Sequence, residues 1–332
     1  MSFKGKNILV TGGCGSVGTE LVNKLVKEAK VIRIFDNYEN GLFQAQQRYK
    51  NHSNVRYLLG DIRDKERLEI AMENIDVVFH TAALKHVWAC EYNPFEAVKT
   101  NIDGLQNVID YAMKHNVEKF IFTSSDKAAN PSNVMGTTKL AGEKLVTAAN
   151  YYKGNKRTVF SSIRFGNVMG SSGSVIPVFK EQIAKGGPVT LTDPKMSRFV
   201  ITMQQAADLV LEAAVQAKGG EVFILKMDAL NVKDLAEVMI AELGNGKKLP
   251  LVTEGAKPGE KMYEELFTEE EATRALEEEH MFVVLPQLTE LFGVKTNYKH
   301  LKPAKIQPYT SRDAKLLSKE EVKSLLKKEG LI

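Results

Sequence analysis

The first half of the chain alternates short apolar runs with amphipathic segments. Runs rich in β-branched and aromatic residues predict strands at 7–11, 31–36, 55–61, 76–81, 119–124 and 158–165. Apolar positions at helical spacing predict helices near 16–28, 64–73, 94–115 and 134–152. Because the strands are almost continuously apolar and alternate with helices, we predict an α/β fold with a doubly wound parallel (Rossmann) sheet.

Beyond Asn167 the pattern changes to turn-rich segments, followed by helical stretches and a short strand in "EVFILKM". A capping box formed by Ser318 and Glu321 is expected to open the last helix. We therefore expect residues 1–167 to form the Rossmann domain. Residues 168–332 are expected to form a smaller α/β lobe that is interleaved with it.

Composition narrows the class of protein. The net charge of +4 is small, and Lys and Arg are scattered, so a nucleic-acid partner is not expected. Cys14 and Cys90 fit neither a disulfide framework nor a metal site, which favours a reducing compartment. The sequence has no apolar run of about 18 residues and no signal-peptide profile at its start. We expect a cytoplasmic protein without a membrane anchor.

Glycines stand between the first predicted strand and the first predicted helix, in "ILVTGGCGSVGTELV". Glycines at such a turn let the backbone approach a pyrophosphate, which rests on the N-terminus of the helix. The alternative is a tight turn that needs glycine for its conformation alone. The strand before and the helix after favour a dinucleotide site. Its expected contacts are Gly12, Gly15, Ser16, Val17 and Gly18.

Asp36 ends the second predicted strand, with Asn37 beside it. A carboxylate there accepts hydrogen bonds from the ribose hydroxyls and repels a 2′-phosphate, so NAD is favoured as the cofactor. NADP stays an alternative, because Arg33, Gln44, Gln47 or Arg48 lies close enough in sequence to reach a 2′-phosphate. Later strand ends are expected to contribute Asp61, Ile62, Ala82 and Ala83 to the same site.

The order of several motifs identifies a family. After the glycine loop come "ALKHV", "EAVKTNIDGLQNV", "SSDKAANPSNVMGTTKLAGEK", "RFGNVMGSSGSVIPVF", "DPKMSRFVIT" and "KPGEKMYEEL". Over residues 3–270 this series resembles the extended short-chain dehydrogenases/reductases, and among them the UDP-N-acetylglucosamine 4,6-dehydratases. The resemblance implies a UDP-sugar substrate, a homo-oligomer and a role in glycan or surface polysaccharide biosynthesis. Met135 stands where many members carry Tyr, although some carry Met.

The implied reaction oxidises carbon 4, eliminates water across carbons 5 and 6, and returns the hydride to carbon 6. The resemblance makes Asp126 the acid for the 6-hydroxyl, with a raised pKa, and Lys127 the base at carbon 5, with a depressed pKa. Lys139, one helical turn after Met135, is expected to bind the nicotinamide ribose. Met135 is expected to fill space against the ligands. Proton removal from the 4-hydroxyl falls to Ser124, Ser125, Asp126 or water.

Substrate contacts are expected from loops of both parts of the chain. Asn101 is expected to support the active-site helix or to contact the cofactor, and Lys85 to contact cofactor or sugar. Arg198 suits a pyrophosphate, because guanidinium makes forked phosphate contacts. Lys257 replaces the Arg that is usual in its motif. The expected substrate contacts are Lys85, His86, Asn167, Ser174, Val175, Pro177, Arg198, Lys257 and Glu260.

Two alternatives remain at this stage. A nucleotide-sugar 4-epimerase keeps the first oxidation but needs no acid at carbon 6, so the Asp126–Lys127 pair argues against it. A non-catalytic dinucleotide-binding protein is what Met135 alone suggests, and the presence of Asp126, Lys127 and Lys139 argues against it. Inversion or retention at carbon 5 is left open.

Overall fold

A ten-stranded sheet organises the chain in the computed structural model, which describes residues 2–255, 259–288, 298, 300–305 and 309–332. Its strand order is β16-β14-β15-β10-β6-β5-β4-β1-β2-β3. The parallel strands are β1 (Asn7–Thr11), β2 (Val31–Asp36), β3 (Val55–Leu59), β4 (Val77–His80), β5 (Lys119–Thr123), β6 (Val159–Arg164) and β10 (Val222–Leu225). An antiparallel edge follows: β15 (Met281–Val284), β14 (Ala275–Glu277) and β16 (Lys302–Pro303).

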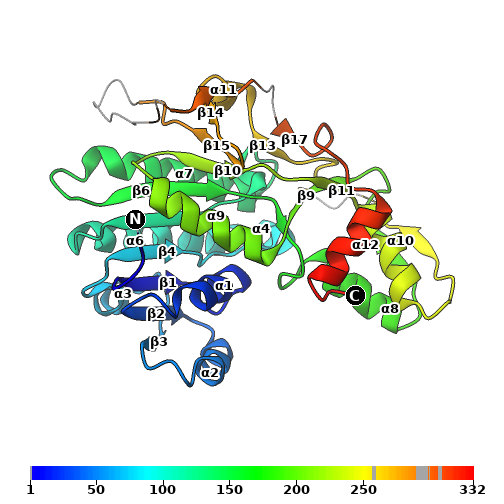
Figure 1. The fold of residues 1–332 in the computed structure, drawn as a ribbon, viewed down its shortest axis with the longest axis horizontal. Helices are drawn as coiled ribbons and strands as arrows, with labels where there is room; N and C mark the ends of the chain where they lie inside the picture. The colour runs from blue at the N-terminus through cyan, green and yellow to red at the C-terminus, as the bar shows by residue number, and fades with distance from the viewer. Residues whose placement is uncertain (1, 256–258, 289–297, 299, 306–308) are drawn as a thin grey trace.

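Helices cover both faces of the sheet (Figure 1). One face carries α1 (Ser16–Leu25), α2 (Glu39–Arg48) and α9 (Met203–Gln216). The other face carries α3 (Lys65–Met72), α6 (Leu105–Lys114) and α7 (Val134–Tyr152). Short elements lead into the last two: α4 (Val87–Tyr92), α5 (Pro94–Val98), a π-helical stretch η1 (Lys99–Gly104) and a 3₁₀ turn η2 (Asp126–Ala128).

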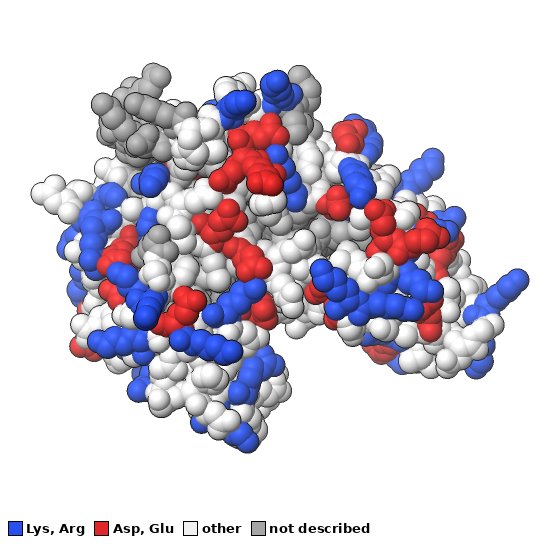
Figure 2. All heavy atoms as spheres, in the orientation of Figure 1, with Lys and Arg blue, Asp and Glu red and all other residues white. Residues whose placement is uncertain are grey.

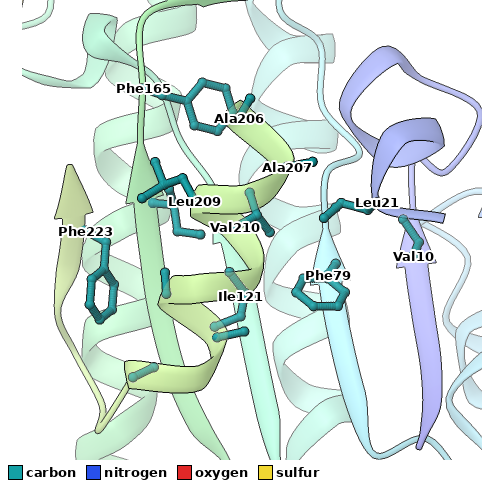
Figure 3. Packing of buried hydrophobic residues seen from close by; sticks show 14 of the residues in the cluster. Val10, Leu21, Phe79, Ile121, Phe165, Ala206, Ala207, Leu209, Val210 and Phe223 are labelled. Atoms are coloured by element: carbon teal, nitrogen blue, oxygen red, sulfur yellow. The ribbon is translucent and has the colours of Figure 1, made fainter. Parts of the chain in front are cut away.

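The alternation of side chains along β1 explains this two-sided packing. Ile8 and Val10 point into one core and Leu9 into the other, because successive residues of a strand face opposite sides. Figure 3 shows the first core, where Val10, Leu21 of α1 and Val210 of α9 come together. Both faces of the strands are buried, which is why the sequence shows apolar runs without alternation.

A smaller lobe stands beside the sheet (Figure 1). Its helices are α8 (Val175–Ala184), α10 (Val232–Leu243) and α12 (Lys319–Lys328), which share a third core. Its strands are β7 (Asn167–Val168), β8 (Val189–Leu191), β9 (Ser197–Ile201), β11 (Ala229–Asn231) and β12 (Leu251–Thr253). A last pair, β13 (Glu265–Phe267) and β17 (Tyr309–Thr310), is followed in the case of β13 by α11 (Glu269–Ala272).

The predicted Rossmann fold class is confirmed by the parallel strand order and the helices on both faces. Residues beyond 167 contribute to both the main sheet and the smaller lobe. Of these residues, β10, β15 and β14 are strands of the main sheet, and α9 covers one of its faces. Figure 2 shows the molecule from the same side as Figure 1. Basic and acidic side chains are interspersed on this side, and a hollow lies between the sheet and the smaller lobe.

Candidate active site

A cleft of about 640 Å³ lies at the carboxyl ends of the parallel strands. Its walls come from the segments that follow β1 to β6, from the start of α7 and from residues 171–174. In open α/β sheets ligands bind at this edge, because the loops of neighbouring strands separate there. The sheet therefore brings together, in one cavity, segments that are far apart in the sequence.

The glycine loop forms one end of the cleft. Gly12 has a φ of +67°, and a Cβ there would lie 2.6 Å from the backbone nitrogen of Ala82. A Cβ at Gly18 would lie 2.5 Å from the carbonyl oxygen of Gly12, so both positions require glycine. Among the described residues no side chain caps α1 after Gly15, and the first N–H groups of the helix stay available to an anion. Ser16 and Val17 line the same end.

Two carboxylates follow the next strands. The Oδ2 atom of Asp36 accepts a hydrogen bond from Cys14 N at 2.9 Å, and its Oδ1 atom accepts one from Tyr38 N at 3.0 Å. Arg63 contacts Asp61 at 2.7 Å and lowers the pKa of that carboxyl. Asn37 donates to Asp61 at 3.2 Å. Further lining residues of this stretch are Ile62, Ala82 and Ala83.

Asn101 lies beneath the cleft and does not line it. Its Oδ1 atom accepts from Leu84 N at 2.8 Å, and its Nδ2 atom donates to Leu84 O at 2.9 Å and to Thr138 Oγ1 at 3.0 Å. These bonds join η1 to α7 and fix the loop after β4. Of the two expected roles, the geometry favours support of the active-site helix over contact with the cofactor.

Asp126 and Lys127 form a buried ion pair directly after β5. Lys127 Nζ lies 3.0 Å from Asp126 Oδ1, and Ser125 Oγ donates to the same oxygen at 2.8 Å. The side chain of Asp126 is 1% exposed, while Lys127 is 19% exposed toward the cleft. A Cβ at Gly136 would lie 2.2 Å from Lys127 O, so α7 packs directly on this turn.

The expected depression of the Lys127 pKa is wrong. Although burial lowers the pKa of Lys127, the carboxylates of Asp126 and Glu264 outweigh it and raise that pKa above its ordinary value. Glu264, just before β13, lies 3.5 Å from Lys127 Nζ and is 3% exposed. Glu264 is not among the residues expected from the sequence, and its available signal is an acidic position shortly before the apolar pair that ends "YEELF".

Lys139 and Met135 come from one face of α7 and both line the cleft. Lys139 Nζ donates to Thr123 O at 2.9 Å, and its burial lowers the Lys139 pKa to about 8. Met135 is buried against Cys90 and Ala97. Thus a thioether packed in an apolar cluster stands one turn from a cation with an unusually low pKa.

Residues 171–174 close the cleft between α1 and the loop after β4. Lys85 Nζ donates to Ser172 O at 2.7 Å, and Ser172 N donates to Ser16 Oγ at 3.3 Å. A Cβ at Gly173 would lie 2.1 Å from His86 Cε1. Lys85, His86 and Ser174, expected as ligand contacts from distant segments, therefore meet around this short loop.

The remaining expected contacts are more dispersed. Asn167 lines the cleft and donates to Phe199 O at 3.2 Å. Arg198 donates to Ser197 O at 2.8 Å, with its Nε 3.8 Å from Glu264, and Glu260 accepts from Thr192 at 3.0 Å. Four expected contacts lie outside the lining of the cleft: Val175, Pro177, Arg198 and Glu260. Lys257 lies outside the described residues.

Three residues that line the cleft carry buried polar atoms without partners in the part of the chain that the structure describes. Within the described chain, Ser124 Oγ, Asp126 Oδ2 and Ser174 Oγ have no hydrogen-bond partner. All three residues line the cleft. Such atoms are costly unless a ligand or water satisfies them. Together with the glycine cradle and the uncapped α1, they fit a dinucleotide and a second polar ligand.

Comparison with known proteins assigns the family. Residues 8–286 match the family described as "Polysaccharide biosynthesis protein". The chain belongs to this family. It is 53% identical to the "uncharacterized membrane protein MJ1061" of Methanocaldococcus jannaschii, over 98% of this chain and 96% of that protein. Among the described residues, no helix has the length and hydropathy needed to cross a bilayer.

Relatives with named activities carry out two related reactions. A "UDP-N-acetylglucosamine 4,6-dehydratase (inverting)" of Campylobacter jejuni is 42% identical over 86% of this chain and 84% of that protein. A "UDP-glucose 4-epimerase" of Rickettsia bellii is 37% identical over 98% and 96%. The X-ray structure of Pen from Bacillus thuringiensis superposes with a TM-score of 0.93 at 47% identity and covers 99% of both chains. The family is thus one of enzymes that modify nucleotide sugars.

Proposed function

We propose that this protein is a nicotinamide-dependent 4,6-dehydratase of UDP-N-acetylglucosamine and a cytoplasmic lyase of polysaccharide biosynthesis. The observation that carries the proposal is the Asp126–Lys127 ion pair, both residues of which line the cleft, while Asp126 Oδ2 is buried without a partner in the described chain. Elimination of water needs an acid and a base next to each other, and a 4-epimerase does not. The relatedness to dehydratases supports the same reaction.

The residues that would hold the dinucleotide are those of the glycine loop, Asp36, Asp61 and Lys139. A nicotinamide held there would supply the redox chemistry of the reaction, which is removal of a hydride from carbon 4 and its later return to carbon 6. The redox change therefore cancels over one turnover. Lys139, a buried cation at this end of the cleft, stabilises negative charge on the 4-oxygen, and the proton of that hydroxyl leaves through Ser124, Ser125, Asp126 or water.

The ion pair supplies the elimination. Transfer of one proton from Lys127 Nζ to Asp126 Oδ1, across their 3.0 Å contact, converts the pair into a neutral amine and a carboxylic acid. The amine then takes the proton of carbon 5, and the acid protonates the departing 6-hydroxyl, which leaves as water. The ammonium and the carboxylate are thereby restored. The proton that carbon 5 takes up when the hydride reaches carbon 6 balances the proton released earlier from the 4-hydroxyl. This route needs no depressed Lys127 pKa in the resting site, because the proton stays within the pair.

Incubation of the protein and NAD with UDP-N-acetylglucosamine in deuterated water tests the proposal. Proton NMR is expected to show a new 6-methyl signal with deuterium at carbon 5, and mass spectrometry a loss of 18 mass units before exchange. The coupling pattern at carbon 5 distinguishes inversion from retention. Formation of UDP-N-acetylgalactosamine without a methyl signal would instead identify a 4-epimerase, the second candidate, which the Rickettsia bellii relative favours.

A further inference from the structure

Glu264 is a second buried carboxylate beside the Asp126–Lys127 pair. Its Oε1 atom lies 3.5 Å from Lys127 Nζ and 3.8 Å from Arg198 Nε. Its Oε2 atom is buried and has no hydrogen-bond partner among the described residues. A buried carboxylate with an unsatisfied oxygen is costly, so its presence next to a catalytic pair calls for a reason.

Two hydrogen bonds with Ser311 hold the backbone of Glu264 in place. Glu264 N donates to Ser311 Oγ at 3.0 Å, and Ser311 N donates to Glu264 O at 2.8 Å. Ser311 follows β17, which pairs with β13. The β13–β17 pair therefore presents the Glu264 carboxylate to the turn that carries Asp126 and Lys127.

The charges around Glu264 are balanced by two elements besides its own. Lys127 and Asp126 face it from η2, and Arg198 faces it from β9. Lys261, of the same segment as Glu264, acts from a greater distance. Its ammonium donates to the carbonyl oxygens of Ala129 and Asn130. Burial raises the pKa of Glu264, and Lys127 opposes that rise. Lys127 thus lies between two carboxylates, and each of them raises its pKa.

We propose that Glu264 is a positioning residue of this site, whose carboxylate holds the Lys127 amine in place together with Asp126 and stabilises its charged form. The inference rests on the proposed dehydration for its catalytic consequence. Glu264 controls how readily Lys127 passes its proton to Asp126, and it keeps the amine aimed at one position in the cleft while that proton moves. Arg198 Nε lies 3.8 Å from the same oxygen of Glu264 that faces Lys127 and is a second cation beside that carboxylate.

The test uses Glu264→Gln, which keeps the shape of the side chain and removes its charge. We expect kcat for 6-methyl formation to fall about tenfold with KM nearly unchanged, because the misalignment of the amine outweighs its easier proton transfer to Asp126 while the cleft stays intact. The control is Glu265→Gln, the adjacent half-buried residue of β13, which is expected to leave both constants unchanged. Circular dichroism and thermal unfolding verify that both variants are folded.

A second measurement does not depend on turnover. Trace acetylation with acetic anhydride across a pH series, read on the Lys127 peptide by mass spectrometry, gives the titration midpoint of Lys127. Glu264→Gln is expected to move this midpoint down by about one pH unit, because one of two stabilising charges is lost. Glu265→Gln is expected to leave it in place.

An unchanged Lys127 midpoint in folded Glu264→Gln protein would overturn the inference. If that variant does not fold, Glu264→Asp replaces it, and a smaller shift in the same direction is expected because the carboxylate is withdrawn by one methylene. Failure of the wild type to make a dehydrated sugar contradicts the proposed function alone. The acetylation comparison still decides the role of Glu264 in that case.

Discussion

Met135 is the residue at which this site departs from the pattern that its family most often shows. Its side chain packs against Cys90 and Ala97 and lies on the same face of α7 as Lys139. A thioether has no proton to exchange, so its contribution is shape. In the proposed reaction the acid–base work falls on Asp126 and Lys127, whose ion pair holds both groups that the elimination needs.

Substitution of Met135 by Leu tests this interpretation. Leu conserves the volume and the apolar character, so we expect a stability loss below about 1.5 kcal/mol. Turnover should change by less than about threefold, because no proton carrier has been removed. Steady-state kinetics and urea unfolding measure the two effects. A loss of about 10² in kcat with normal stability would show that the sulfur takes part in the chemistry.

Single residues also show how far sequence can lead. Asp126, Lys127, Met135 and Lys139 were expected at the site, and they line one cleft, because motif order places them after β5 and at the start of α7. Glu264 was not predicted, because it is far from Lys127 in the sequence although the two side chains lie 3.5 Å apart. The raised pKa of Lys127 was not predicted either, because that pKa depends on which carboxylates surround the amine.

At the scale of elements, Arg164 joins the sheet to the segments that carry Glu264. This residue at the end of β6 is fully buried. Its guanidinium contacts Glu143 of α7 at 2.5 Å and Glu271 of α11 at 2.9 Å, and donates to Leu266 O of β13 at 2.7 Å. One side chain thus holds three elements around the candidate active site. Burial lowers the pKa of Arg164, but the two carboxylates outweigh burial and raise that pKa above its ordinary value.

Replacement of Arg164 by Met should be severely destabilising. Glu143 and Glu271 would be left buried without their counter-charge, a loss of about 3–5 kcal/mol in the free energy of unfolding. Urea unfolding followed by circular dichroism measures it. The control is Arg157→Met, a half-exposed residue that contacts Glu118 at 3.2 Å and is expected to cost less than about 1 kcal/mol. Equal losses in the two variants would show that Arg164 does not hold these elements together.

The strands and helices could be predicted from the sequence where the two alternate, up to about residue 167, and much less well beyond it. β1 to β6 fall within the predicted apolar runs, since burial on both faces forces continuous apolar sequence. The helix α4 was not predicted, because its six residues are too few for a helical period and expose Trp88 and Tyr92. The π-helical stretch inside the predicted helix 94–115 depends on tertiary contacts such as those of Asn101.

For the whole molecule, the cleft follows from topology. The parallel order β3-β2-β1-β4-β5-β6 places the loops that follow these strands at one edge. Strand–helix alternation predicts the parallel sheet, and the structure supplies the strand order. The antiparallel edge of β15, β14 and β16 could not be deduced, because its partners come from distant segments whose pairing has no local signal. The way in which residues beyond 167 return to the sheet is a property of that pairing.

Cofactor choice is a property of the whole cleft, and Asp36 is its test. Both carboxylate oxygens of Asp36 already accept a backbone N–H, which fixes the group at the end of β2. Each oxygen can accept a second hydrogen bond, so Asp36 can still bind the free hydroxyls of a ribose. A 2′-phosphate would be repelled by the carboxylate.

We therefore expect NAD to stabilise the protein against thermal unfolding more than NADP does at equal concentration. At 100 times its Kd, NAD should add about 2.7 kcal/mol to the free energy of unfolding.

The variant Asp36→Asn keeps the shape of the side chain and removes the repulsion. The difference in stabilisation between NAD and NADP should therefore narrow. Differential scanning fluorimetry across a concentration series of each dinucleotide measures this for both proteins. Stronger stabilisation of the wild type by NADP would mean that a cation accommodates the phosphate and that Asp36 does not control the choice. Arg33 does not line the cleft, and its guanidinium donates to the carbonyl oxygens of Ile70, Ala71 and Glu73. Equal effects in wild type and variant would place the discrimination elsewhere in the cleft.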